Sequence, residues 1–400
     1  MSGADLLHLA VALDGAGWHP AAWRHVSSRP DELLTAQYWV DIVRESEAGL
    51  LDFVTIEDSN NLQSSSLTDL ELRTDRVRGR LDAMLLACRI APHTAKIGIV
   101  PTTVTTDTEP FHISKAIATL DYISIGRAGW RATISNSPGD AALYGRRLQS
   151  GTADGAKPPV YTCIEKLFDE ATDSVEVVRR LWDSWEDGAI IRDASTGRFL
   201  EKEKVHHIDF ESEWFSVRGP SITPRPPQGQ PVVTVVSNSA VSYGFAAQSA
   251  DVVHVTPHDL ADANRIVAEV RHAENLHFRS GANLKILADL VVFLDDTESR
   301  AASCKQYLDS LDDTASQSDT AVFTGTASQL ADLLLDWQSA GLHGFQLLPG
   351  VVTHDLPAIT RELVPELQRR GVFRDAYEAT TLRGHLGLER PPSRYSDSSA

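Results

Sequence analysis

The stretch EPFHISKAIATLDYISIGRAGWRATIS, residues 109–135, contains a predicted helix followed directly by a predicted strand. The pattern of Phe111–Tyr122 is helical, and Glu109-Pro110 before it is a normal helix start, because proline is favoured in the first helical turn. Gly129–Ser135 is a short, mostly apolar run, which is typical of a strand covered on both faces. A helix joined to such a strand is the unit of parallel α/β folds.

The same unit recurs along the chain. Helical patterns occupy Leu33–Gly49, Leu81–Ala91 and Ile164–Trp185, the last with apolar residues at 3.6-residue spacing. Eight strands match the closing number of a (β/α)8 barrel, the fold we predict. A doubly wound open sheet is the alternative, and no dinucleotide fingerprint follows the first strand to support it. The other seven predicted strands are Leu7–Leu13, Phe53–Glu57, Ile97–Thr103, Val232–Val236, Val252–Thr256, Leu284–Leu294 and Gly344–Leu348.

One long segment interrupts this alternation after the fourth strand. Residues 136–231 include the Gly/Pro-rich stretch GTADGAKPPV and end in RGPSITPRPPQGQP. We expect a single barrel domain over residues 1–390, with 136–231 inserted at the C-terminal ends of the strands, where a barrel places its active site. The polar tail 391–400 is expected to be disordered.

Composition excludes several classes of function. The 400 residues carry a net charge of −18, which argues against nucleic acid or an anionic membrane as the main partner. No apolar run approaches the roughly 18–20 residues of a membrane span, and the N-terminus lacks the basic region of a signal peptide. Three widely spaced cysteines form no CxxC pair. We therefore expect a cytoplasmic protein with reduced thiols.

The chemistry must come from residues at the strand ends, because the motifs of phosphate loops, HExxH metalloproteases and GxSxG hydrolases are absent. Ser237-Asn238-Ser239 precedes a predicted helix and suits either a phosphate or plain helix capping. Asp58 follows a strand and suits a polar cofactor group or a turn cap. His206, His207 and Asp209 lack a further ligand at useful spacing, so we predict no metal site.

The segment 109–135 also resembles a characteristic stretch of the bacterial luciferase-like flavin monooxygenases, in the branch that acts on nitrilotriacetate, EDTA and dibenzothiophene sulfone. GWHPAAWR (17–24), YWVDIVRESEAGLLDFVTIED (38–58) and VEVVRRLWDSWEDGAIIRD (175–193) agree with it. The resemblance implies a (β/α)8 barrel that uses reduced FMN and O2 through a flavin C4a-(hydro)peroxide. It also implies a separate NAD(P)H-dependent flavin reductase, a small organic substrate, and a homodimer or homotetramer.

Carried over by position, the resemblance assigns cofactor-binding roles. These fall on Asp58, Thr102, Thr103, Ser135, Ser237, Asn238 and Ser239. Two positions depart from the family pattern. Arg131 stands where the family has asparagine, and Phe168 stands where many members have a phosphate-contacting tyrosine, for which Tyr161 is a possible substitute.

For substrate orientation or proton transfer the candidates are Asp14, His19 and Arg131, with His19 best suited by its ordinary pKa. Arg131 either reaches the flavin or a substrate anion, or fills the pocket. Two alternatives to the monooxygenase stay open. One is an F420-dependent hydride-transfer oxidoreductase, and the other is a degenerate flavin-binding barrel without catalysis.

Overall fold

The computed structural model describes residues 6–60, 62, 73–137, 140, 143–144, 163–279, 281–312 and 319–396. Within them, eight parallel strands close into a barrel, because the eighth pairs with the first. All eight predicted strands are confirmed, with ends that differ by at most two residues. They are β1 (His8–Leu13), β2 (Phe53–Ile56), β3 (Gly98–Val104), β4 (Gly129–Thr133), β9 (Val232–Val236), β10 (Val252–Val255), β11 (Lys285–Leu294) and β13 (Gly344–Pro349).

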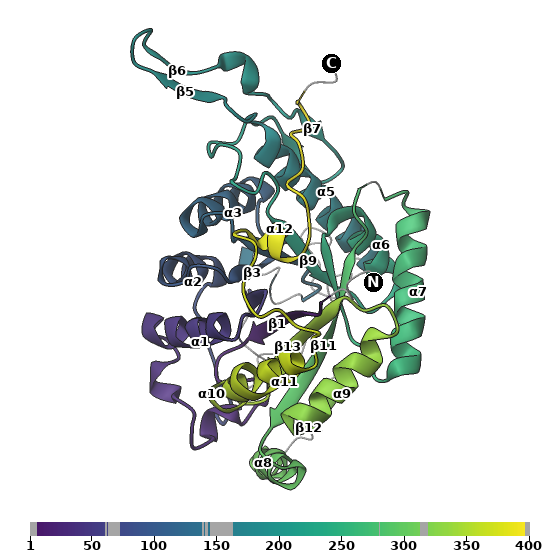
Figure 1. Cartoon of the computed structure of the whole chain (residues 1–400). Helices are drawn as coiled ribbons and strands as arrows, with labels where there is room; N and C mark the ends of the chain where they lie inside the picture. The colour runs from purple at the N-terminus through teal and green to yellow at the C-terminus, as the bar shows by residue number, and fades with distance from the viewer. Residues whose placement is uncertain are drawn as a thin grey trace, which may run out of the picture.

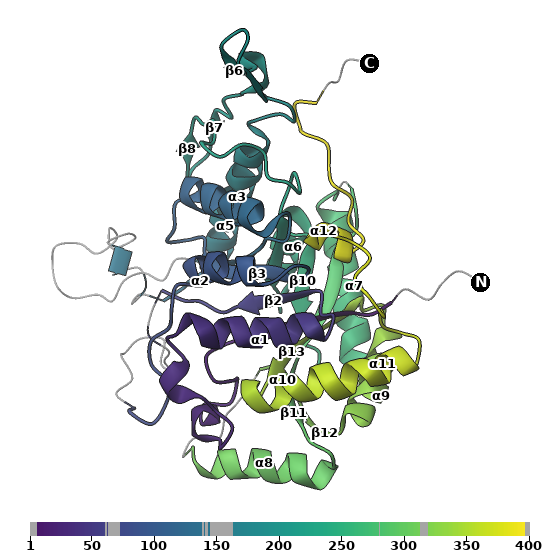
Figure 2. The same cartoon turned by 60° about the vertical axis from the view of Figure 1, so that its left-hand side comes forward.

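Helices surround the barrel, as Figures 1 and 2 show. The main hydrophobic core lies between the outward-facing strand residues and the apolar faces of these helices. The helices are α1 (Ala36–Ala48), α2 (Ala83–Ile90), α3 (Pro110–Ser124), α5 (Ile164–Asp183), α6 (Ala240–Ser249), α7 (Leu260–Leu276), α9 (Ala327–Gln338) and the run α10 (Val352–Ala358), η6 (Ile359–Leu363) and α11 (Val364–Arg369).

One barrel connection is longer than the others. Strand β11 continues past the barrel wall and pairs with β12 (Val322–Gly325), and α8 (Glu298–Ser310) lies between these two strands. This excursion follows the C-terminal end of β11. In both views α8 marks one end of the molecule (Figures 1 and 2).

The segment 136–231, which we expected to be an insertion at the C-terminal ends of the strands, is described by the structure over residues 136–137, 140, 143–144 and 163–231. Its helix α5 packs between α3 and α6, so it is the barrel's own helix after β4. The residues after α5 form two hairpins, β5 (Ile190–Asp193) with β6 (Arg198–Leu200) and β7 (Phe210–Glu211) with β8 (Ser216–Val217). Because α5 runs back along the barrel, these hairpins lie near the N-terminal ends of the strands, opposite α8 (Figure 2).

The chain's C-terminal segment closes that same end of the barrel. Leu382, which begins α12 (Leu382–His385), packs with Phe53 and Val100 of the barrel interior. A side chain at Gly129 would collide with Val100 and Leu382, so glycine is needed there. Because this segment covers the N-terminal ends of the strands, we expect the active site at the C-terminal ends.

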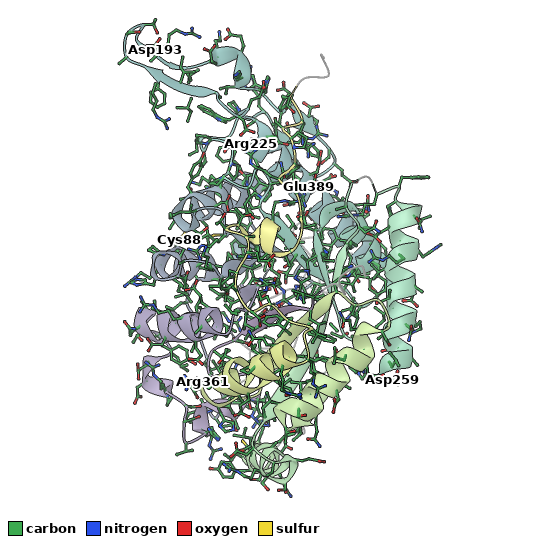
Figure 3. The ribbon with its side chains drawn as sticks, in the orientation of Figure 1. Cys88, Asp193, Arg225, Asp259, Arg361 and Glu389 are labelled. Carbon is green, nitrogen blue, oxygen red and sulfur yellow. The ribbon has the colours of Figure 1, made fainter. Side chains whose placement is uncertain are left out.

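Residues 391–396, which we expected to be disordered, also belong to the ordered structure. Arg394 forms a bidentate ion pair with Glu176 of α5, and the Pro391 carbonyl accepts a hydrogen bond from Arg225 at 2.9 Å. Figure 3 shows Arg225 where the hairpin segment meets the barrel and Asp193 at the hairpin tip. None of the described helices is both long and apolar enough to cross a membrane.

Candidate functional site

Arg131 and Glu57 form an ion pair inside the C-terminal half of the barrel. Arg131 lies on β4, and its Nη1 donates to Glu57 Oε1, directly after β2. The same Nη1 lies 3.4 Å from Thr55 Oγ1. The two charged side chains are 7% and 17% exposed, so water screens the pair only weakly. The sequence left open whether Arg131 reaches a ligand or fills the pocket, and it gave no sign that Glu57 is its partner.

Hydrogen bonds continue from this pair across the barrel. Thr55 Oγ1 donates to Gln346 Oε1 at 3.2 Å, and Gln346 Nε2 donates to Asp289 Oδ1 at 3.3 Å. Asp289 Oδ1 also lies 3.0 Å from His254 Nδ1. All four residues are buried on barrel strands. A signal for them existed in the sequence, since each is a polar residue inside an otherwise apolar strand.

Four polar atoms in this interior have no hydrogen-bond partner among the described residues: Thr102 Oγ1, Thr234 Oγ1, Arg131 Nε and His254 Nε2. The strand register places Thr102, Arg131 and Thr234 side by side on β3, β4 and β9. Buried polar atoms almost always find a partner. The barrel interior therefore offers hydrogen-bonding capacity to a small polar group.

The two predicted threonines of β3 point in opposite directions, as neighbours on a strand must. Thr102 faces the barrel interior with Val100 and is 1% exposed. Thr103 faces the helix layer instead, where its Oγ1 accepts a hydrogen bond from Trp130 Nε1. Only Thr102 of this pair can serve a ligand inside the barrel. Assigning Thr103 to the cofactor is therefore wrong for its side chain.

Ser237 and Ser239 are engaged in capping α6. Ser239 is its N-cap, and the Ser239 and Ser242 side chains form a capping box. Ser237 Oγ donates to the Ser242 carbonyl at 3.0 Å, and the Asn238 N–H donates to Ser242 Oγ at 3.1 Å. The Asn238 side chain is exposed. The helix still begins at the C-terminal end of β9, so its positive end faces the predicted site.

Two predicted carboxylates lie at the C-terminal ends of β1 and β2. Asp58 accepts backbone N–H bonds from Ser59 at 2.8 Å and from Ala83 at 2.9 Å, which ties it to the start of α2. Asp14 Oδ1 lies 3.7 Å from Arg80 Nη2. Burial raises the pKa of both carboxyls above the ordinary value.

Ser135 and His19 make local contacts that occupy their polar atoms. Ser135 Oγ donates to Asp140 Oδ2 at 2.6 Å. His19 Nδ1 accepts the Ala21 N–H at 3.1 Å, and its Nε2 lies 3.1 Å from Asp309 Oδ1. Burial lowers the pKa of His19, although Asp309 opposes this. Since both ring nitrogens are engaged, His19 is fixed as a loop-ordering residue in this structure.

The histidines His206 and His207 lie in the segment after α5 and make separate contacts. His206 Nε2 lies 2.7 Å from Glu186 Oε1, and its ring stacks on Tyr395 at 4.0 Å. His207 contacts the Gly219 carbonyl instead. Among the residues that the structure describes, no cluster of three or more His, Cys, Asp or Glu side chains is arranged to hold a metal. Phe168 packs on Phe245 with ring centres 5.6 Å apart, and Tyr161 lies outside the described residues.

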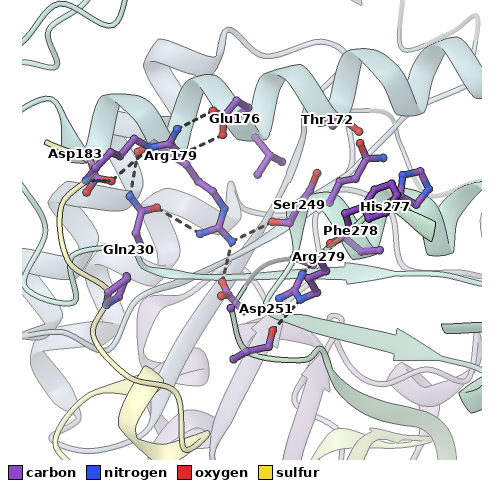
Figure 4. Close-up of a pocket in the computed structure, with 18 of the residues that line it drawn as sticks. Thr172, Glu176, Arg179, Asp183, Gln230, Ser249, Asp251, His277, Phe278 and Arg279 are labelled. Carbon is purple, nitrogen blue, oxygen red and sulfur yellow. Dashed lines mark hydrogen bonds and ion pairs between the residues drawn. The ribbon is translucent and has the colours of Figure 1, made fainter. Parts of the chain in front are cut away.

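A cavity of about 610 Å³ lies at the opposite end of the barrel, between α5 and the residues that precede β9 and β10 (Figure 4). Asp251 accepts hydrogen bonds there from Arg179 at 2.9 Å and from Arg383 at 3.2 Å. Burial raises the pKa of Asp251, but the two arginines outweigh it and bring the pKa to about 2. This ion network joins the C-terminal segment to the barrel and is separate from the candidate site.

Comparison with known proteins decides the family. The model of the family described as luciferase-like monooxygenase matches residues 16–343. The chain belongs to this family. Its relatives include N-acetyl-S-(2-succino)cysteine monooxygenase of Bacillus subtilis, 30% identical over 98% of both chains. Nitrilotriacetate monooxygenase component A of Aminobacter aminovorans is 31% identical over 96% of this chain and 97% of its own.

The solved structures support the same fold. A riboflavin lyase determined with modified FMN and riboflavin has a TM-score of 0.84, with 24% identity over 97% of each chain. The resemblance seen in residues 109–135 is thus confirmed, as is the barrel. As a luciferase-like monooxygenase, the chain belongs to a flavin-dependent group of enzymes.

Proposed function

We propose that this luciferase-like monooxygenase is the oxygenase component of a two-component system that uses reduced FMN and O2 to oxidise a small organic substrate. A separate NAD(P)H-dependent reductase would supply the reduced flavin. The observation that carries the proposal is the family match over residues 16–343, joined to 31% identity with a protein named as component A of a monooxygenase. The hydrogen-bonding capacity at the C-terminal half of the barrel supports it.

The residues present fit a phosphate-bearing flavin. Thr102 offers a buried hydroxyl without a partner among the described residues, and the first turn of α6 at Ser239 offers the positive end of a helix. Asp58 and Ser135 lie after the C-terminal ends of β2 and β4, the two strands that flank β3. When bound, reduced FMN supplies the electrons that activate O2, while the protein excludes water and orients the substrate.

An anaerobic titration of the purified chain with reduced FMN tests the proposal. We expect saturable binding, and a pulse of aerated buffer should then give a long-lived absorbance band that differs from reduced and oxidised FMN. Absence of binding would refute the proposal. Retention of F420 by the purified chain would favour hydride transfer on the same barrel.

A pair of matched variants tests the site. Thr102→Val should weaken binding of reduced FMN by about 0.5–1.5 kcal/mol, the value of one hydrogen bond, which is roughly 2- to 10-fold in Kd. Thr103→Val is the control, because its hydroxyl faces Trp130 and the helix layer. Equal effects of the two variants would place the flavin elsewhere.

A further inference from the structure

Asp14 and Glu57 are neighbours at the C-terminal ends of β1 and β2. The parallel register pairs Leu13 with Ile56, and the Glu57 N–H donates to the Leu13 carbonyl at 3.1 Å. Leu13 and Ile56 belong to the core beneath the helices. Because side chains alternate along a strand, the next residue on each strand, Asp14 or Glu57, turns toward the barrel axis. Two carboxyl groups therefore face the same end of the barrel from adjacent strands.

The charges around these two carboxyls differ. Glu57 is ion-paired with Arg131, so it presents a carboxylate to its neighbour. The charged groups that act on Asp14 are Arg80, Glu57 and Asp58. Burial raises the pKa of Asp14, Arg80 opposes this, and the two carboxylates add to the rise. A carboxylate beside a second carboxyl disfavours ionisation of that carboxyl, so Asp14 holds its proton more tightly than an isolated aspartate does.

We propose that Asp14 carries the transferable proton of the active site and that Glu57, held in place by Arg131, is the positioning residue that keeps this proton on Asp14. The inference rests on the proposed oxygenase function. His19, the acid that its ordinary pKa favoured, has both ring nitrogens occupied. Asp14, by contrast, has the single cation Arg80 within 4 Å among the described residues.

The proton step balances with the proposed reaction. In the proposed reaction, one oxygen atom of O2 enters the substrate and reduced FMN supplies the electrons. The second oxygen atom is thereby reduced to hydroxide. The O–H bond of Asp14 breaks and a new O–H bond forms on that oxygen, which leaves as water. The electron pair stays on the Asp14 carboxylate, where Arg80 at 3.7 Å stabilises it. Solvent then returns the proton.

Infrared difference spectroscopy of the full chain, without flavin, tests the protonation of Asp14. The Asp14→Asn variant identifies the C=O band of the protonated carboxyl by subtraction, and the band is followed against pH. Glu57→Gln removes the neighbouring charge at nearly constant shape, so the midpoint of the band should fall by about one pH unit. Arg131→Gln should raise the midpoint, because the carboxyl pair loses its counter-ion, and Arg131→Lys should restore it.

Glu211→Gln, in the exposed hairpin β7–β8, is the matched control and should leave the midpoint unchanged. An Asp14 band whose midpoint does not lie above the ordinary pKa of an aspartate, or that Glu57→Gln does not move, overturns the inference. Titration with reduced FMN separates the two proposals. Normal flavin binding with an unmoved band refutes only the role of Glu57. A shifted band in a chain that binds no flavin refutes the oxygenase function and, with it, the donor role of Asp14.

Discussion

Acid should loosen the junction between the C-terminal segment and the barrel by protonating Asp251. The native pKa of this carboxyl is about 2, against about 3.9 in an unfolded chain. A depressed native pKa contributes stability that is complete above the unfolded value and is lost as the pH falls toward the native value. The difference of about two units corresponds to roughly 2.5 kcal/mol at pH 7, and about half of that is lost by pH 3.

Urea denaturation of the wild type and of Asp251→Asn, at several pH values between 7 and 3, measures this contribution. At pH 7 the variant should be less stable by roughly 3–5 kcal/mol, because Arg179 and Arg383 lose their shared carboxylate. The difference in the free energy of unfolding between the wild type and the variant should narrow by about 1 kcal/mol by pH 3, because Asp251 of the wild type becomes protonated. Asp375→Asn, at an exposed position, is the control. A difference that stays constant across this range would refute the reasoning.

Three further changes test local contacts by urea denaturation. Ser239→Ala should cost about 1 kcal/mol, because its hydroxyl caps α6, and unchanged stability would contradict this role. Thr103→Val should cost about 1 kcal/mol and alter tryptophan emission, since Trp130 loses its hydrogen-bond acceptor. Arg131→Asn should cost roughly 3 kcal/mol by leaving Glu57 unpaired, and adding Glu57→Gln should recover most of that loss. A double variant whose loss of stability equals the sum of the two single losses would show that the pair is not coupled.

The barrel was predictable because each of its strands can be recognised from a short stretch of sequence. Each buried parallel strand is a short apolar run, and such runs can be counted without knowing which strands pair. For the described part of the segment 136–231, the sequence shows the helix α5 but not the direction in which this helix runs along the barrel. That direction places the hairpins near the N-terminal strand ends, while the strand-end residues of the candidate site lie at the other end.

The site was harder to predict because its decisive contacts join residues far apart in sequence. Arg131 and Glu57 are separated by 74 residues and belong to β4 and to the end of β2, which flank β3, so they meet only in the folded sheet. From the sequence alone, Arg131 is a cation that a flavin or an anionic substrate could bind. With Glu57 beside it, the pair is neutral, and the carboxylate that it fixes acts on Asp14. If the proposal on Asp14 holds, the role of Arg131 is to fix the carboxylate of Glu57 next to Asp14.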